Sequence, residues 1–70
     1  MSQITFSVPE IHCDHCKHSI EGALRPLSGV ARADVDVASK LVSVDFGDPA
    51  TIASMTAAIE EQGYDVAGTV

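Results

Sequence analysis

Two cysteines, Cys13 and Cys16, stand two residues apart in the stretch IHCDHCKH, which covers residues 11–18. His12 precedes the pair, His15 lies inside it and His18 follows it, and the 70-residue chain has no other cysteine. Thiolates bind soft metal ions and carry redox chemistry, and imidazole nitrogens bind zinc and copper. The stretch therefore indicates a metal site, a redox pair, or two unreactive thiols in a core.

The polar residues around the pair argue against unreactive core thiols, because His12, Asp14 and His15 need water. A disulfide between Cys13 and Cys16 would close a very short loop and constrain little of the chain. A thioredoxin-like redox pair stays open, since a histidine between the cysteines can stabilise a thiolate. Against it, the chain is short for that fold, and the proline expected ahead of the opposing strand is not evident.

A soft-metal site fits the cysteines better, and Cu(I) is the ion that two thiolates satisfy. Zinc ranks second because it prefers four ligands, so it would need two histidines as well, or Asp14 as a hard ligand. Two thiolates and Cu(I) carry a net charge of about −1, which the positive end of a helix partly offsets. A third thiolate from another protein can attack a two-coordinate ion, and this suits a carrier.

The pattern of apolar residues predicts the elements that position the pair. Alternation predicts strands at 3–9, 30–37 and 41–46 and a short last strand that holds Tyr64, Val66 and Gly68. Helical spacing predicts a helix from Cys16 to Leu27, and a second helix with Asp48 as N-cap, Pro49 first and Gly63 as C-terminal cap. The order βαββαβ predicts an α+β, ferredoxin-like domain over residues 1–70, a four-stranded antiparallel sheet with both helices on one face.

This arrangement puts the cysteines at the junction of the first strand and the first helix. The free N–H groups and the positive end of the helix should lower the thiol pKa values there. Cys16 shares the apolar stripe of Ile20 and Leu24, so it should be the more buried of the pair, and Cys13 the more exposed.

Composition limits the function further. The net charge is −6, only four residues are basic, and aromatic residues are few, so nucleic acid is excluded as a partner. No apolar run is long enough to span a membrane, and no signal peptide is visible. We therefore expect a cytoplasmic protein with reduced thiols, and its size favours a binding module over an enzyme.

With the pair at this place in this topology, the sequence resembles the heavy-metal-associated domains. These include cytosolic copper chaperones and the N-terminal domains of copper-exporting P-type ATPases. The resemblance rests on IHCDHC, on the pattern LxxLxGV at Leu24, Leu27, Gly29 and Val30, on the hairpin, and on EEQGYDV. It implies that Cys13 and Cys16 bind Cu(I), which passes to the metal-binding domain of an ATPase by docking and thiolate exchange.

The sequence departs from that family where Glu10, Ile11 and His12 replace the usual Gly-Met-Thr. Ile11 can pack as the family's methionine does, and His12 is a candidate to contact or tune the metal. Tyr64 matches a tyrosine that bacterial copper chaperones carry beside the metal loop. His12, His15 and Tyr64 are therefore predicted neighbours of the ligands.

We interpret the chain as a cytosolic Cu(I) chaperone without catalytic residues, monomeric without metal and open to a metal-bridged dimer when loaded. The alternatives are an N-terminal metal-binding domain of a copper or zinc transport ATPase and, in another class, a small dithiol oxidoreductase. The early first strand and the end at Val70 favour a free-standing protein. We also expect an acidic rim at the metal end, made of Glu10, Asp14, Glu21 and Asp65 against Lys17 alone.

Overall fold

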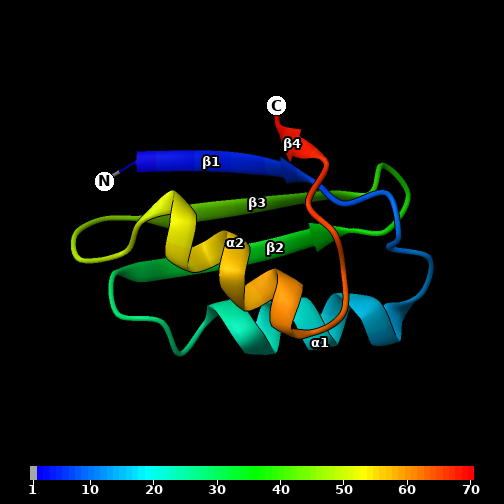
Figure 1. Cartoon of the computed structure of the whole chain (residues 1–70), viewed down its shortest axis with the longest axis horizontal. Helices are drawn as coiled ribbons and strands as arrows, with labels where there is room; N and C mark the ends of the chain where they lie inside the picture. The colour runs from blue at the N-terminus through cyan, green and yellow to red at the C-terminus, as the bar shows by residue number, and fades with distance from the viewer. Residues whose placement is uncertain (1) are drawn as a thin grey trace.

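The structure, a computed structural model, describes residues 2–70. Its elements follow the order β1 (Ser2–Ser7), α1 (Asp14–Leu24), β2 (Val30–Asp36), β3 (Leu41–Phe46), α2 (Ile52–Glu61) and β4 (Gly68–Thr69). The strands form one antiparallel sheet in the order β2-β3-β1-β4 (Figure 1). The predicted ferredoxin-like βαββαβ fold is confirmed.

The core lies between the two helices and one face of the sheet. Alternate strand positions are buried while their neighbours, such as Asp34, stay exposed, as expected for a sheet that is covered on one side. The register places Phe6 opposite Val42 and Ile4 opposite Val44, so β1 and β3 form the centre of this face. The fully buried large side chains of the core are Phe6, Val8, Ile11, Ile20, Leu24, Val42, Val44, Met55 and Ile59.

The first helix begins earlier than the sequence indicated. It was expected from Cys16 to Leu27, but it runs from Asp14 to Leu24 with Cys13 as the N-cap. Asp14 is the first residue of the helix. The helix ends at the Arg25 C-cap, whose backbone is still helical, because the following residue, Pro26, has no N–H to continue the helical hydrogen bonds.

The second helix also differs at its start, and the last strand is shorter than expected. Asp48 and Pro49 form a turn, and Thr51 is the true N-cap, in a capping box with Ser54. Gly63 follows the helix with φ 92°, which confirms its predicted left-handed conformation. Tyr64 and its neighbours up to residue 67 form an extended connection, and only Gly68–Thr69 pair with β1.

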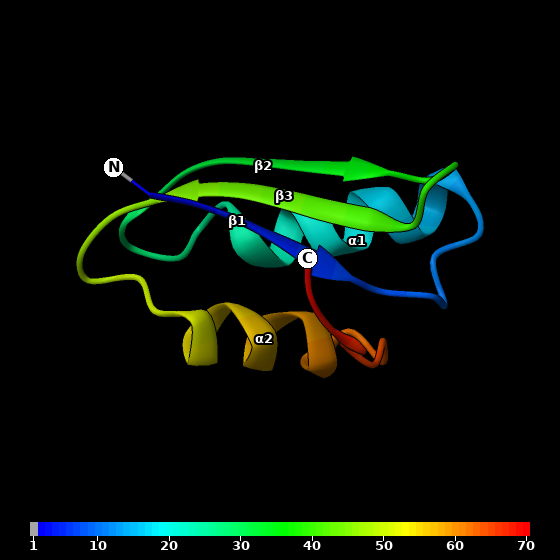
Figure 2. The same ribbon diagram turned by 90° about the horizontal axis from the view of Figure 1, so that it is seen from above.

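Three connections gather at one end of the molecule, on the right in Figures 1 and 2. They are the β1–α1 loop, the β2–β3 turn and the segment from α2 to β4. The cysteine pair lies in the first of them, so its surroundings come from parts of the chain that are far apart in sequence. Among residues 2–70, no helix is long and apolar enough to cross a membrane.

Candidate metal centre

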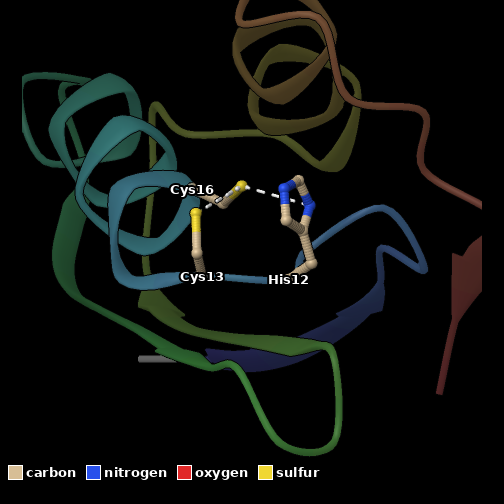
Figure 3. A group of neighbouring side chains, drawn as sticks. All are labelled: His12, Cys13 and Cys16. Atoms are coloured by element: carbon tan, nitrogen blue, oxygen red, sulfur yellow. Dashed lines mark hydrogen bonds between the residues drawn. The ribbon is translucent and has the colours of Figure 1, made fainter.

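The structure brings His12, Cys13 and Cys16 together at the start of α1 (Figure 3). The two Sγ atoms are 3.7 Å apart, and the Cys16 Sγ lies 3.8 Å from Nδ1 of His12. One ligand atom from each of the three residues lies within 4.8 Å of the other two. Of all histidine, cysteine and acidic side chains in the described part of the chain, these form the one group of three compact enough to hold a single ion.

The helix gives the two sulfurs different surroundings. Cys16 belongs to the buried stripe of α1 and is only 2% exposed, while Cys13 is partly exposed, so the predicted order of burial is confirmed. As N-cap, Cys13 has an extended backbone and its side chain makes no capping hydrogen bond. Its sulfur therefore stays free to bind a ligand close to the unpaired N–H groups of the first turn.

The metal loop, residues 8–13, is fixed from both sides. Ile11 is fully buried, which confirms that it packs into the core, and its N–H donates to the carbonyl of Val8 at 3.1 Å. The Nζ of Lys40, in the β2–β3 turn, donates to the Ile11 carbonyl at 3.0 Å. The backbone N–H of Val8 donates in turn to the carbonyl of Lys40 at 3.0 Å. Two hydrogen bonds thus join the metal loop to this turn.

The Glu10 side chain links the loop to the segment after α2. Its Oε1 accepts a hydrogen bond of 2.7 Å from the backbone N–H of Asp65. The neighbouring Tyr64 is half-buried and packs against the core cluster that contains Cys16. This bond therefore holds the tyrosine segment beside the metal loop.

The pKa of Cys16 is lowered from 9.0 to about 7, and the main cause is hydrogen bonding from the Tyr64 hydroxyl to the thiolate. Bonds from the backbone of His12 and from Cys13 lower it further, while burial opposes them. The same contact with Cys16 raises the pKa of Tyr64, because a phenolate beside a thiolate is disfavoured. Tyr64 was predicted as a neighbour of the ligands, and the structure places it against the core cluster that contains Cys16.

The histidines divide into one at the site and two outside it. Nδ1 of His12 lies 2.8 Å from the carbonyl oxygen of Glu10, which can only accept, so this nitrogen carries the proton and donates. His15 and His18 are exposed and do not join the group with the cysteines. The loop geometry therefore separates His12 from two residues that sequence proximity could not distinguish.

The charges at this end differ from the predicted acidic rim. Glu21 is 5% exposed, and its Oε2 accepts a hydrogen bond of 3.1 Å from the backbone N–H of Val35 in β2. Its Oε1 pairs with Arg25 at 3.1 Å, so Glu21 is a structural residue and its placement on the rim was wrong. Lys40 was missed as a basic residue beside the metal loop, because its sequence position gives no sign of the Ile11 contact.

The fold and the paired thiols define a small metal-binding module. Residues 5–65 match the heavy-metal-associated domain family, and the chain belongs to this family. The match covers the metal loop, both helices and the hairpin.

Within this family, the chain is similar to proteins that are named copper chaperones. The chain is 49% identical to the copper chaperone CopZ of Staphylococcus saprophyticus over 67 residues, which are 94% of this chain and 98% of that protein. Identity to the copper chaperone CopZ of Staphylococcus aureus strain JH9 is 43% over the same shares. The chain is thus a homologue of these copper chaperones.

Solved structures show the same architecture. A structure of the CopZ metallochaperone superposes with a TM-score of 0.89 at 42% identity, covering 93% of this chain and 98% of that one. A copper binding domain from HMA7, a P-type ATPase, superposes with a TM-score of 0.89 at 25% identity, covering 99% and 97%. The fold is therefore shared by a metallochaperone and by an ATPase domain.

Proposed function

We propose that this protein is a cytoplasmic Cu(I) chaperone that binds the ion through Cys13 and Cys16 and passes it to the metal-binding domain of a copper-transporting P-type ATPase. The observation that carries the proposal is the pair of thiols 3.7 Å apart at the start of a helix. The names of the relatives and the match to the family support it. The protein acts as a carrier and not as an enzyme.

The site suits a monovalent soft ion. Soft thiolate ligands select Cu(I), and the two of them leave one negative charge at the positive end of α1. With a pKa of about 7, Cys16 is already a thiolate in about half of the molecules at neutral pH. In those molecules, the buried sulfur can bind the ion without first losing a proton.

Release can follow from the exposure of the other sulfur. Cys13 lies partly open at the N-cap, so a thiolate of the recipient can approach the ion from that side. An ATPase domain with the same fold offers a matching site, as the likeness to the HMA7 domain illustrates. Ligand exchange between two such sites moves the ion without setting it free in solution.

The rival function, a dithiol oxidoreductase, fits the same residues less well. Reactive cysteines of redox proteins combine a lowered pKa with partial exposure. Here the lowered pKa belongs to Cys16, which is 2% exposed. The thiol that is prepared for attack is thus the one that a disulfide substrate cannot reach.

The test compares Cu(I) affinity in wild type, C13S and C16S, measured under reducing conditions by competition with a chromophoric Cu(I) chelator. Each serine variant should keep the fold, because the large core side chains lie elsewhere, and each should lose tight binding. H18A, at an exposed histidine outside the group, is the matched control and should bind like wild type.

A second arm mixes the loaded protein with the separate metal-binding domain of a copper ATPase and follows the ion by size-exclusion chromatography. Copper should redistribute between the two proteins. Tight Cu(I) binding that persists in both serine variants would refute the proposal, as would a copper shell dominated by nitrogen in X-ray absorption.

A further inference from the structure

His12 stands where a third metal ligand would stand. Its ring reaches toward the cysteine pair from the metal loop, and Nδ1 is 3.8 Å from the Cys16 sulfur (Figure 3). Two thiolates already satisfy Cu(I), so the proposed cargo does not require this side chain. The position of His12 is therefore a feature that copper transport alone leaves unexplained.

The distances match a site with more than two ligands. At zinc–sulfur bonds of about 2.3 Å, a linear ion would hold two sulfurs about 4.6 Å apart and a tetrahedral ion about 3.8 Å apart. The observed Sγ–Sγ distance is 3.7 Å. With a zinc–nitrogen bond of about 2.05 Å, the nitrogen–sulfur distance would be about 3.6 Å in a tetrahedral site and about 3.8 Å in a trigonal one. The observed Nδ1–Sγ distance is 3.8 Å.

The case for a third ligand depends on the histidine distance, because two neutral thiols in contact would also have their sulfurs about 3.7 Å apart. The remaining pair, Cys13 Sγ and the His12 nitrogen, lies within 4.8 Å, against about 3.6–3.8 Å in a tetrahedral or trigonal site. An ion at this site would therefore draw the Cys13 side chain, which is partly exposed, toward the His12 ring.

The hydrogen bond of His12 makes its ligation conditional. Nδ1 donates its proton to the Glu10 carbonyl at 2.8 Å, so a metal at this atom must displace the proton to Nε2 and break that bond. A Cu(I) ion already held by two thiolates gains little binding energy from the histidine to offset the loss of that hydrogen bond. A borderline divalent ion that prefers four ligands gains much more.

We propose that His12, Cys13 and Cys16 together form a second mode of this site, which binds a borderline divalent cation such as Zn(II) with a fourth position open to water or to a thiolate of a partner. This deepens the proposed function and rests on its two cysteine ligands. Two thiolates, one imidazole and a water is a donor set that zinc adopts in proteins. Binding releases the remaining thiol protons to solvent, and neither the metal nor the protein is oxidised or reduced.

The test titrates the reduced protein with Zn(II) against a chromophoric zinc chelator, and with Co(II) as a spectroscopic substitute. H12A should weaken Zn(II) binding by at least about tenfold, the loss expected when a metal site loses such support. H15A is the matched control, since His15 lies between the cysteines but outside the group, and it should bind Zn(II) like wild type. Wild type with Co(II) should show the intense visible bands of a tetrahedral site, and H12A should lose intensity.

The outcomes separate this inference from the proposed function. If C13S and C16S lose Cu(I) while H12A leaves both Zn(II) affinity and the Co(II) spectrum unchanged, the inference fails and the chaperone stands. An equal loss of Zn(II) in H15A would also overturn it. H12S, with circular dichroism to confirm folding, repeats the test with a second side chain, and Cu(I) affinity should stay close to wild type in both His12 variants.

Discussion

Replacing Tyr64 by phenylalanine tests how the fold prepares the buried thiol. The change removes one hydroxyl and keeps the ring that packs against the core. That hydroxyl is the largest cause of the lowered pKa of Cys16, which falls from 9.0 to about 7. In Y64F, the backbone bonds and the Cys13 contact remain, and burial still opposes them.

The expected size of the effect follows from these opposing causes. Loss of the largest favourable contribution should raise the pKa of Cys16 by about one unit. At pH 7, the thiolate fraction would then fall from about half to about one tenth. Loading with Cu(I) at neutral pH should slow accordingly, because fewer molecules present a ready thiolate.

The assay is an NMR titration of protein labelled with ¹³C at the cysteine Cβ atoms, which reports the two thiols separately. Separate signals matter because thiols 3.7 Å apart titrate as a coupled pair. An unchanged Cys16 titration in Y64F would refute the assigned role of the hydroxyl. A shift confined to Cys13 would show that the tyrosine acts on the other sulfur.

The dependence of folding stability on pH gives an independent check of the direction of the Cys16 pKa shift. A thiol whose pKa is lower in the folded state stabilises the fold fully above the unfolded pKa of 9.0, and this contribution disappears as the pH falls through about 7. Y64F should therefore lose more stability relative to wild type at about pH 9 than at about pH 6 in denaturant titrations. Equal losses at both pH values would mean that the tyrosine contributes packing alone.

Two further predictions concern the support of the site. E21A should destabilise the fold by about 1–3 kcal/mol in denaturant titrations, because the buried backbone N–H of Val35 loses its acceptor. R25A should cost less than about 1 kcal/mol, since its side chain is largely exposed, and an equal cost would contradict this account. K40M removes the Nζ bond to the Ile11 carbonyl and should speed alkylation of the cysteine pair, as mapped by mass spectrometry. K40G removes the same bond and should speed alkylation too. Glycine suits the local φ of 61°, so K40G should not weaken the turn. Rates equal to wild type in both variants would show that this bond does not restrain the metal loop.

The sheet could be predicted well because its burial pattern is simple. One face is covered and the other is open, so apolar and polar residues alternate along β2 and β3. The first residues of the helices were harder to predict. The apolar stripe of α1 begins at Cys16, but the helix starts two residues earlier, where its first turn faces outward. In α2, the Asp48-Pro49 signal obscured the capping box of Thr51 and Ser54 three residues further on.

The site was predictable only where its chemistry is local. Cys13 and Cys16 could be identified from their residue type and spacing, and their difference in burial follows from the apolar stripe of the helix. Nothing local separates His12 from His15, because the direction of each ring depends on the loop. The Lys40 contact joins residues 29 positions apart, so it depends on how the hairpin packs against the loop.

The unequal environments of the two sulfurs give the proposed transfer a direction. Cys16 is held by a helix packed in the core, and its lowered pKa keeps it available as a thiolate. Cys13 sits at the helix N-cap without a capping bond, so its sulfur can leave the ion without breaking a structural contact. An incoming thiolate should therefore replace Cys13 first, while Cys16 retains the ion until the recipient's second sulfur arrives. In the proposed transfer, the buried cysteine would thus retain the ion and the exposed one would exchange it.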